Sequence, residues 1–168
     1  KGSETEKNLL KAFAGESQAR NRYTYFSSVA KKEGYEQISA IFLETAENEK
    51  EHAKIFFKYL NECGGEGLEI TAIYPSGKIG TTSENLLAAA NGEREEWSDL
   101  YKNFEEVAKK EGFEEIAVSF KEIAEVEEEH EKRYRKLLTN IEDEIVFRKD
   151  NVIKWKCRNC GYVHEGNE

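Results

Sequence analysis

The sequence predicts an all-α fold: a four-helix bundle made of two repeated helical hairpins with one long crossover, followed by a short C-terminal β segment. Three features support it: long stretches with apolar residues at helical spacing, an internal repeat, and one long glycine-containing connection. One proline and 35% charged residues among 168 are typical of a mostly helical protein. We expect the bundle over residues 1–144 and the β segment over residues 145–168.

The two halves of the chain match each other at a nearly constant offset. Residues 9–16 correspond to 86–93 at an offset of 77, and residues 30–35 correspond to 108–113 at an offset of 78. Two Glu–His pairs repeat at the same 78-residue offset: Glu49 and His52 with Glu127 and His130. A chance similarity of composition would not keep its offset over this distance, so the repeat indicates a duplicated helical hairpin.

The first half is predicted to contain two helices. Ser3 and Glu6 form a capping-box pattern, which predicts the start of a helix that runs to about Lys32. Gly34 is placed to end this helix, since glycine adopts the left-handed conformation common just after a helix. Apolar residues at helical spacing predict the second helix over about residues 35–61.

The second half is predicted to follow a crossover over about residues 63–82. Thr82 or Ser83 caps a third helix that runs to about residue 110, and a fourth helix spans about residues 114–140. Two hairpins joined by one long crossover are the topology of ferritin-like bundles.

One residue is inserted between the repeats inside the third helix. Glu16 and Tyr23 are seven residues apart, whereas Glu93 and Tyr101 are eight apart, so the offset changes from 77 to 78. A continuous helix absorbs one extra residue most easily as a π-bulge, and such bulges are frequent at functional sites. We therefore predict a π-bulge between residues 93 and 101.

Acidic residues occur where the bundle core should be apolar. Glu16 and Glu93 lie among apolar neighbours, and residues three apart on a helix share one face, so each Glu-x-x-His pair can reach one point. An isolated glutamate on a helix is usually a solvated surface residue, but here the repeat superposes every member. The pattern is that of a di-iron or di-manganese carboxylate site in a helical bundle. Its predicted ligands are Glu16, Glu49, His52, Glu93, Glu127 and His130.

Three further residues have two interpretations each. Glu96 lies three residues after Glu93 and is either a seventh ligand or a surface acid beside Glu95. Tyr23 and Tyr101 superpose in the repeat and either donate hydrogen bonds to ligand carboxylates or serve as core aromatic residues.

The C-terminal segment contains a second metal motif. Cys157 and Cys160 follow a predicted strand and supply half of a tetrahedral sulfur site. An iron site with four cysteine ligands needs a second cysteine pair, which the sequence does not contain. We interpret Cys63, in the crossover, as an ordinary free thiol. The segment is thus expected to bind iron only if the missing pair is supplied.

Charge and hydropathy exclude several classes of protein. The net charge of −9 argues against nucleic-acid binding and against docking on anionic membranes. No apolar run approaches the length of a membrane-spanning helix, and no signal-peptide pattern is present, so we expect a cytoplasmic protein. The absence of methionine, even at the first position, indicates a processed or incomplete chain.

These motifs together resemble the rubrerythrin family over essentially the whole chain. The residues that carry the resemblance are AGESQARNRY at residues 14–23, ExxHAK from Glu49, ExxE from Glu93, ExxHEKR from Glu127, and CRNCGYVHEG at residues 157–166. The family joins a ferritin-like di-iron bundle to a C-terminal rubredoxin-like domain. The resemblance implies a peroxidase that reduces hydrogen peroxide in anaerobic or microaerophilic cells, protecting them from oxidative stress. A rubredoxin or an NAD(P)H-dependent reductase would donate the electrons.

The resemblance also implies roles for individual residues. Two iron ions, bridged by an oxo group and by carboxylates, would be bound by Glu16, Glu49, His52, Glu93, Glu96, Glu127 and His130. Glu49 and Glu127 would bridge the irons, and one iron would exchange Glu96 for His52 on reduction. Glu96, His52 and Glu49 are thus the expected catalytic residues, with Glu49 and Glu96 as candidate proton relays. Tyr23 and Tyr101 would hydrogen-bond site carboxylates, and the protein would form a homodimer or higher homo-oligomer.

Two other functions are compatible with the residues. A ferroxidase or iron storage protein of the ferritin type would use a similar bundle, and a sensor or structural module would use the metal only to hold the fold. The Cys-x-x-Cys motif and the extra acid favour the peroxidase, because iron storage needs neither. Zinc or manganese can occupy the same ligands.

Overall fold

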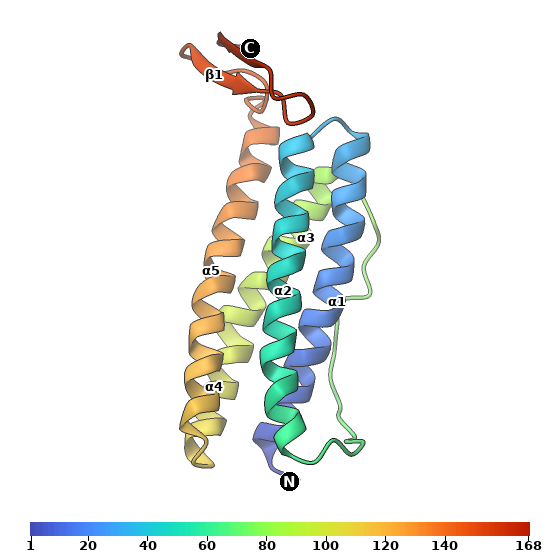
Figure 1. The fold of residues 1–168 in the computed structure, drawn as a ribbon, viewed down its shortest axis with the longest axis vertical. Coiled ribbons are helices and arrows are strands. Elements are labelled where there is room, and N and C mark those ends of the chain that lie inside the picture. Colours follow the sequence, from blue (N-terminus) through green and yellow to red (C-terminus); the bar gives the residue numbers. More distant parts are fainter.

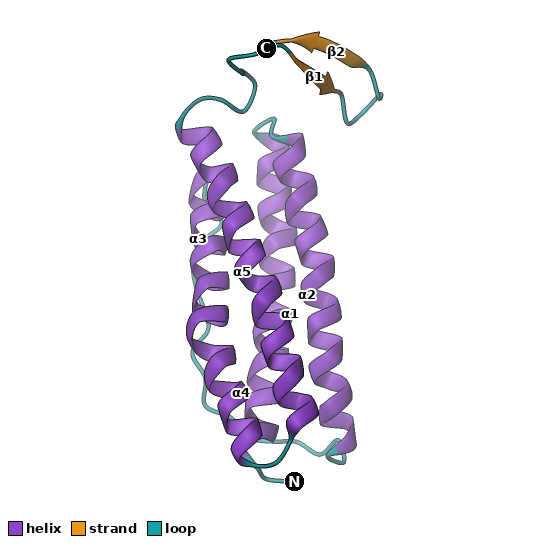
Figure 2. Ribbon diagram, turned by 90° about the vertical axis from the view of Figure 1, so that its left-hand side faces the viewer, coloured by secondary structure: helices purple, strands orange, loops and turns teal.

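The amphipathic stretches form an antiparallel bundle that places its apolar faces inward. The computed structural model describes residues 1–168. Two hairpins lie side by side, and a small sheet lies beyond one end of the bundle (Figures 1 and 2). The elements in order are α1 (Glu4–Lys32), α2 (Glu36–Glu62), α3 (Thr82–Glu95), η1 (Glu96–Leu100), α4 (Tyr101–Lys110), α5 (Glu114–Glu142), β1 (Ile153–Lys156) and β2 (Val163–Gly166).

The predicted π-bulge is confirmed. The π-helical turn η1 joins α3 to α4 without a break, so these three elements form the single third helix of the bundle. The turn accommodates the one residue by which the second half exceeds the first. α1, its counterpart in the first half, is α-helical throughout.

Two predictions about helix starts need correction. Thr81, rather than Thr82 or Ser83, caps the third helix, because its side chain and that of Glu84 form a reciprocal capping box. At the start of α1 the box is only half formed. The Ser3 side chain accepts from the Glu6 amide, but the Glu6 carboxylate accepts from the amide of Gly2 instead of Ser3.

The short turn of each hairpin caps the first helix of the other hairpin. Both turns end their helix with a left-handed glycine, Gly34 and Gly112. Glu33, in the first turn, accepts from the amide of Thr82 at 3.0 Å. Glu111, in the second turn, accepts from the amide of Thr5 at 2.8 Å. Negative charge at a helix N-terminus also interacts favourably with the helix dipole, so these contacts join the hairpins at both ends.

The repeat also builds two equivalent aromatic clusters in the core. The rings within each cluster lie 5.1–6.2 Å apart, in arrangements favourable for aromatic packing. Each cluster contains one residue from each of three helices: Tyr23, Phe42 and Tyr134 in one, and Tyr101, Phe120 and Phe56 in the other. The buried acids belong to the same four helices.

The crossover and the C-terminal segment lie outside the bundle. The crossover runs along α1 over much of the bundle's length (Figure 1). Beyond α5, the ring of Phe147 stacks on that of Tyr35 at 5.7 Å, next to the turn between α1 and α2. β1 and β2 pair in antiparallel fashion, with Trp155 opposite His164. No helix contains an apolar stretch long enough to cross a membrane.

Candidate metal centre

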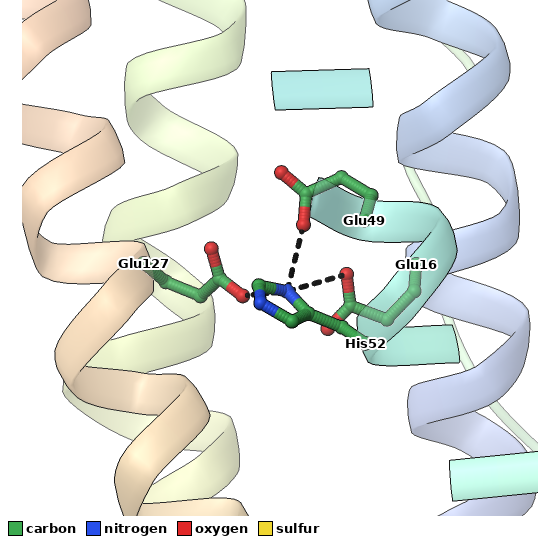
Figure 3. A group of neighbouring side chains, drawn as sticks. All are labelled: Glu16, Glu49, His52 and Glu127. Carbon is green, nitrogen blue, oxygen red and sulfur yellow. Dashed lines mark hydrogen bonds and ion pairs between the residues drawn. The ribbon is translucent and has the colours of Figure 1, made fainter. Parts of the chain in front are cut away.

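Four side chains from three helices converge on one point in the core. Glu16 comes from α1, Glu49 and His52 from α2, and Glu127 from α5, and each offers a ligand atom within 4.8 Å of the others. Figure 3 shows the His52 ring between the three carboxylates. Its Nδ1 atom lies 2.8 Å from Glu127, 3.0 Å from Glu49 and 3.8 Å from Glu16.

A second group lies beside the first and shares two of its members. It consists of Glu49, Glu93, Glu127 and His130, again with ligand atoms within 4.8 Å of one another. The His130 Nδ1 atom lies 2.7 Å from Glu127 and 3.2 Å from Glu49. Because Glu49 and Glu127 belong to both groups, two cations bound here would share these two carboxylates. Each hairpin then supplies one unshared glutamate and one histidine to its own group.

The polar atoms of both groups fit metal binding. All six residues are buried, and some of their polar atoms, such as the Oε2 atom of Glu93, have no hydrogen-bond partner. Buried polar atoms without partners are costly. Two divalent cations would neutralise the four carboxylates and occupy these free atoms. The cluster is thus consistent with a di-iron site.

Burial and mutual repulsion shift the protonation of the unshared acids. Burial, together with the charge of Glu49, raises the pKa of Glu16 to about 7, although hydrogen bonding to His52 opposes the shift. Burial and the charge of Glu49 raise the pKa of Glu93 well above its usual range. Burial alone would lower the pKa of His130, but the carboxylates of Glu127 and Glu49 raise it to about 9. The metal-free site therefore retains protons that a cation must displace.

The two tyrosines both pack in the core and bond the ligands. The Tyr23 hydroxyl donates to Glu93 at 2.5 Å, and the Tyr101 hydroxyl donates to Glu16. Each tyrosine thus binds the unshared acid of the opposite hairpin. Burial raises the pKa of both phenols well above the usual range, so they remain protonated donors.

Glu96 lies close to the site but belongs to neither group. It begins the π turn, and its Oε1 atom lies 3.8 Å from the position that a Cβ atom on Gly15 would occupy. Burial, followed by the charge of Glu16, raises the pKa of Glu96 well above its usual range. Its role as a seventh ligand stays a prediction.

A polar network beside the π turn was not predicted from the sequence. The Trp97 ring N–H donates to Glu131 at 2.7 Å, and Arg135 donates to the same carboxylate and, at 3.2 Å, to Asn91. Glu131 is buried and follows His130 directly. The repeat pairs Glu131 with Ala53, and this replacement of a small apolar residue by an acid was the available signal.

The two C-terminal cysteines lie at the tip of the β hairpin. The N–H groups of Cys160 and Asn159 lower the pKa of the exposed Cys157 thiol, which favours the thiolate form that binds metals. Cys63 ends α2 at the opposite end of the bundle (Figure 1), where its thiol donates to the Tyr59 carbonyl at 3.5 Å. It is a free thiol, as expected.

Known proteins are similar to this chain in sequence and in fold. The family model described as Rubrerythrin matches residues 7–138. A rubrerythrin from Porphyromonas gingivalis is 64% identical over 163 residues, which cover 97% of this chain and 80% of the relative. The structure of fully reduced, all-ferrous nigerythrin aligns with a TM-score of 0.74 at 33% identity, covering 99% of this chain and 78% of the other.

A more distant structure shares the bundle. Desulfovibrio desulfuricans bacterioferritin, described with a diiron site in different catalytic states, aligns with a TM-score of 0.72 at 25% identity. The alignment covers 83% of this chain and 81% of that one. The fold is therefore ferritin-like. The family model and the high identity to the P. gingivalis protein go further, and show that the chain belongs to the rubrerythrin family.

Proposed function

We propose that this protein is a cytoplasmic non-haem di-iron peroxidase that reduces hydrogen peroxide to water with electrons from a rubredoxin-type iron centre. The observation that carries the proposal is the pair of buried ligand groups that share Glu49 and Glu127. Shared carboxylates would keep two ions close enough to act on both oxygens of one peroxide, as in two-metal catalysis. Membership of a family of oxidoreductases adds support.

When bound, the ferrous pair would supply the two electrons of the reaction. The residues around it orient the ligands and supply protons. The hydroxyls of Tyr23 and Tyr101 hold Glu93 and Glu16 in place. The Glu96 Oε1 atom lies 3.8 Å from the position of a Cβ atom on Gly15, next to Glu16, and its raised pKa favours the protonated form, so we assign Glu96 the role of proton donor.

The position of His52 supports the expected ligand exchange. Its Nδ1 atom points into the first group, whereas Glu96 lies outside both groups. In the proposed exchange, His52 would bind one iron in place of Glu96 when the iron is reduced. Cys157 and Cys160 would hold half of the rubredoxin-type centre. A rubredoxin or an NAD(P)H-dependent reductase would supply electrons, and the protein would act as a homodimer or higher homo-oligomer.

Anaerobic stopped-flow absorbance tests the proposal. The protein is loaded with two ferrous ions per chain and mixed separately with hydrogen peroxide and with dioxygen. We expect oxidation by peroxide to be at least about 100-fold faster than by dioxygen, within the range that general acid catalysis contributes. Glu96→Ala should lose this preference, while Glu106→Ala, which removes an exposed acid on α4, should keep it. Equal rates with both oxidants would contradict the peroxidase.

The similarity to bacterioferritin supports a second candidate, a ferroxidase or iron storage protein. This function predicts faster oxidation by dioxygen and iron uptake beyond two ions per chain. Light scattering would then detect a cage of many subunits. A small oligomer that binds no more than two ions in the bundle would exclude storage.

A further inference from the structure

A cavity of about 490 Å³ opens beside the metal centre. It lies between α1, the region of η1 and α4, and residues 71–75 of the crossover. Its apolar wall includes Ala12, Tyr74, Leu100 and Phe104. The crossover thus forms one wall of this cavity, although it contributes no residue to either ligand group.

The inner wall of the cavity consists of residues that contact the ligand groups. Tyr23 and Tyr101 line it, and their hydroxyls bond Glu93 and Glu16. Glu96 also lines it. A Cβ atom on Gly15 would lie 3.8 Å from Glu96 and 3.7 Å from the Tyr74 ring. Gly15 therefore leaves open the space between the crossover and Glu96.

The cavity is much larger than hydrogen peroxide requires. A water molecule, which is similar in size to hydrogen peroxide, takes up about 30 Å³ of liquid. Pockets for small organic ligands begin at about 300 Å³ and combine apolar walls with a few polar groups. This cavity has that size. Nine of the 19 residues that line it are hydrophobic, and Glu96 is the acidic group on the side of the metal centre, whereas Lys11, Arg22 and Glu95 are its other charged residues.

We propose that the cavity admits organic hydroperoxides, with the apolar group against Tyr74, Leu100 and Phe104 and the peroxy group at Glu96. This inference rests on the proposed peroxidase function and extends it to a second substrate class. The O–O bond of R–O–O–H breaks, and two electrons come from the two ferrous ions, which become ferric. With two protons, the products are one alcohol, R–OH, and one water.

Binding is tested first on the full chain loaded with zinc, which is redox-inert and allows no turnover. Cumyl alcohol, the product from cumene hydroperoxide, is titrated by calorimetry. We expect saturable binding that Gly15→Leu weakens by at least about tenfold, because the leucine side chain fills the cavity. Ser28→Leu adds the same side chain to the exposed face of α1 and should bind as the unmodified protein does. Tyr74→Trp narrows the cavity from the crossover and should also weaken binding, although it removes the hydrogen bond that the Tyr74 hydroxyl donates to the Lys11 carbonyl of α1.

Turnover is tested on the ferrous protein with cumene hydroperoxide and with hydrogen peroxide. We expect one cumyl alcohol per oxidised iron pair. In Gly15→Leu, the rate with cumene hydroperoxide relative to that with hydrogen peroxide should fall by about tenfold. If hydrogen peroxide oxidises the protein quickly but cumyl alcohol neither binds nor forms, this inference is overturned and the peroxidase stands. If neither peroxide reacts faster than dioxygen, the peroxidase itself fails.

Discussion

The two hairpins supply equivalent ligands but differ around them. Each contributes one unshared glutamate, one histidine and one shared glutamate, and each tyrosine bonds the glutamate of the opposite hairpin. Only the second hairpin contains a π turn, Glu96 and the network of Trp97 and Glu131. α1, in the first hairpin, passes the site as a regular helix.

This difference suggests a division of roles within the duplicated fold. The symmetric residues are sufficient to hold two cations. Of the asymmetric residues, Glu96 lines the cavity beside the ligand groups, whereas Trp97 bonds Glu131 on α5. The inserted residue therefore coincides with the features that we assign to catalysis, whereas the repeat accounts for metal binding.

The largest expected effect is the loss of metal affinity when a ligand is removed, and the symmetry of the ligands predicts how many ions are affected. Removal of a shared carboxylate, by Glu49→Ala or Glu127→Ala, should weaken binding of both ions. Removal of an unshared one, by Glu16→Ala or Glu93→Ala, should weaken binding of only one. We expect losses of at least about 100-fold in affinity, above the range seen when an outer hydrogen-bond partner is removed. Zinc titration by calorimetry measures both stoichiometry and affinity.

The matched control is Glu125→Ala, which removes an exposed acid from α5. It should bind two zinc ions with unchanged affinity. Loss of only one ion in Glu127→Ala would contradict a shared ligand and would break the proposed symmetry of the two groups.

The next largest expected effect is a change in the stability of the metal-free protein with pH. The pKa values of Glu16, about 7, and His130, about 9, lie above those of the unfolded chain, so the folded state binds more protons. Stability should therefore be greatest at about pH 5 and fall as pH rises to about 9. We expect the melting temperature to fall by more than about 5 °C over this range.

The zinc-loaded protein provides the control for this titration. Cations replace the protons of the site, so its melting temperature should change much less above pH 7. Carboxyl NMR should also show that Glu16 and Glu93 both titrate above the usual range of glutamate, because both side chains are buried and both lie near the charge of Glu49. A metal-free protein that becomes more stable between pH 5 and 9 would contradict the assigned protonation.

The features predicted from the sequence are those that the repeat makes visible. Glu16 and Glu93 stood out because each acid had an equivalent, and the π turn followed from a single shift in offset. Contacts between hairpins cannot be read from the repeat, even where their residues are equivalent, as Glu33 and Glu111 are at an offset of 78. The caps from Glu33 and Glu111, and the cavity under Tyr74, depend on how elements distant in sequence pack together. Thr81 was missed because three consecutive residues can cap a helix, and the position of Glu84 decides among them.

Trp97→Phe tests whether the hydrogen-bond network of the second hairpin stabilises its π turn. The substitution keeps an aromatic ring and removes the N–H that donates to Glu131. A lost hydrogen bond to a charged group is worth about 1.5–3 kcal/mol, so amide exchange at residues 96–101 should become at least about tenfold faster. Residues 16–23 of α1 should be unaffected. Trp155→Phe, in the β hairpin, is the control, and equal exchange in both variants would mean that the network does not hold the π turn.

The smallest expected effects are the losses of melting temperature when the helix caps formed by Glu33 and Glu111 are removed. Glu111 accepts from the amides of Glu4 and Thr5 and from the Thr5 hydroxyl, whereas Glu33 accepts only from the amide of Thr82. Loss of a helix cap costs about 1 kcal/mol, which corresponds to about 2–4 °C in a protein of this size. Glu111→Ala should therefore lower the melting temperature by about that amount, and Glu33→Ala by less.

The pH dependence of the two cap variants distinguishes capping from general loss of charge. Hydrogen bonds from Thr5 lower the pKa of Glu111, so its contribution is present at neutral pH and disappears as pH falls below about 4. Glu111→Ala and the unmodified protein should therefore converge in melting temperature in acid. A difference in melting temperature that persists at pH 3 would show that Glu111 stabilises the hairpin contact without its charge. Equal losses of melting temperature in Glu33→Ala and Glu111→Ala would show that the two ends of the bundle are as symmetric as the ligands.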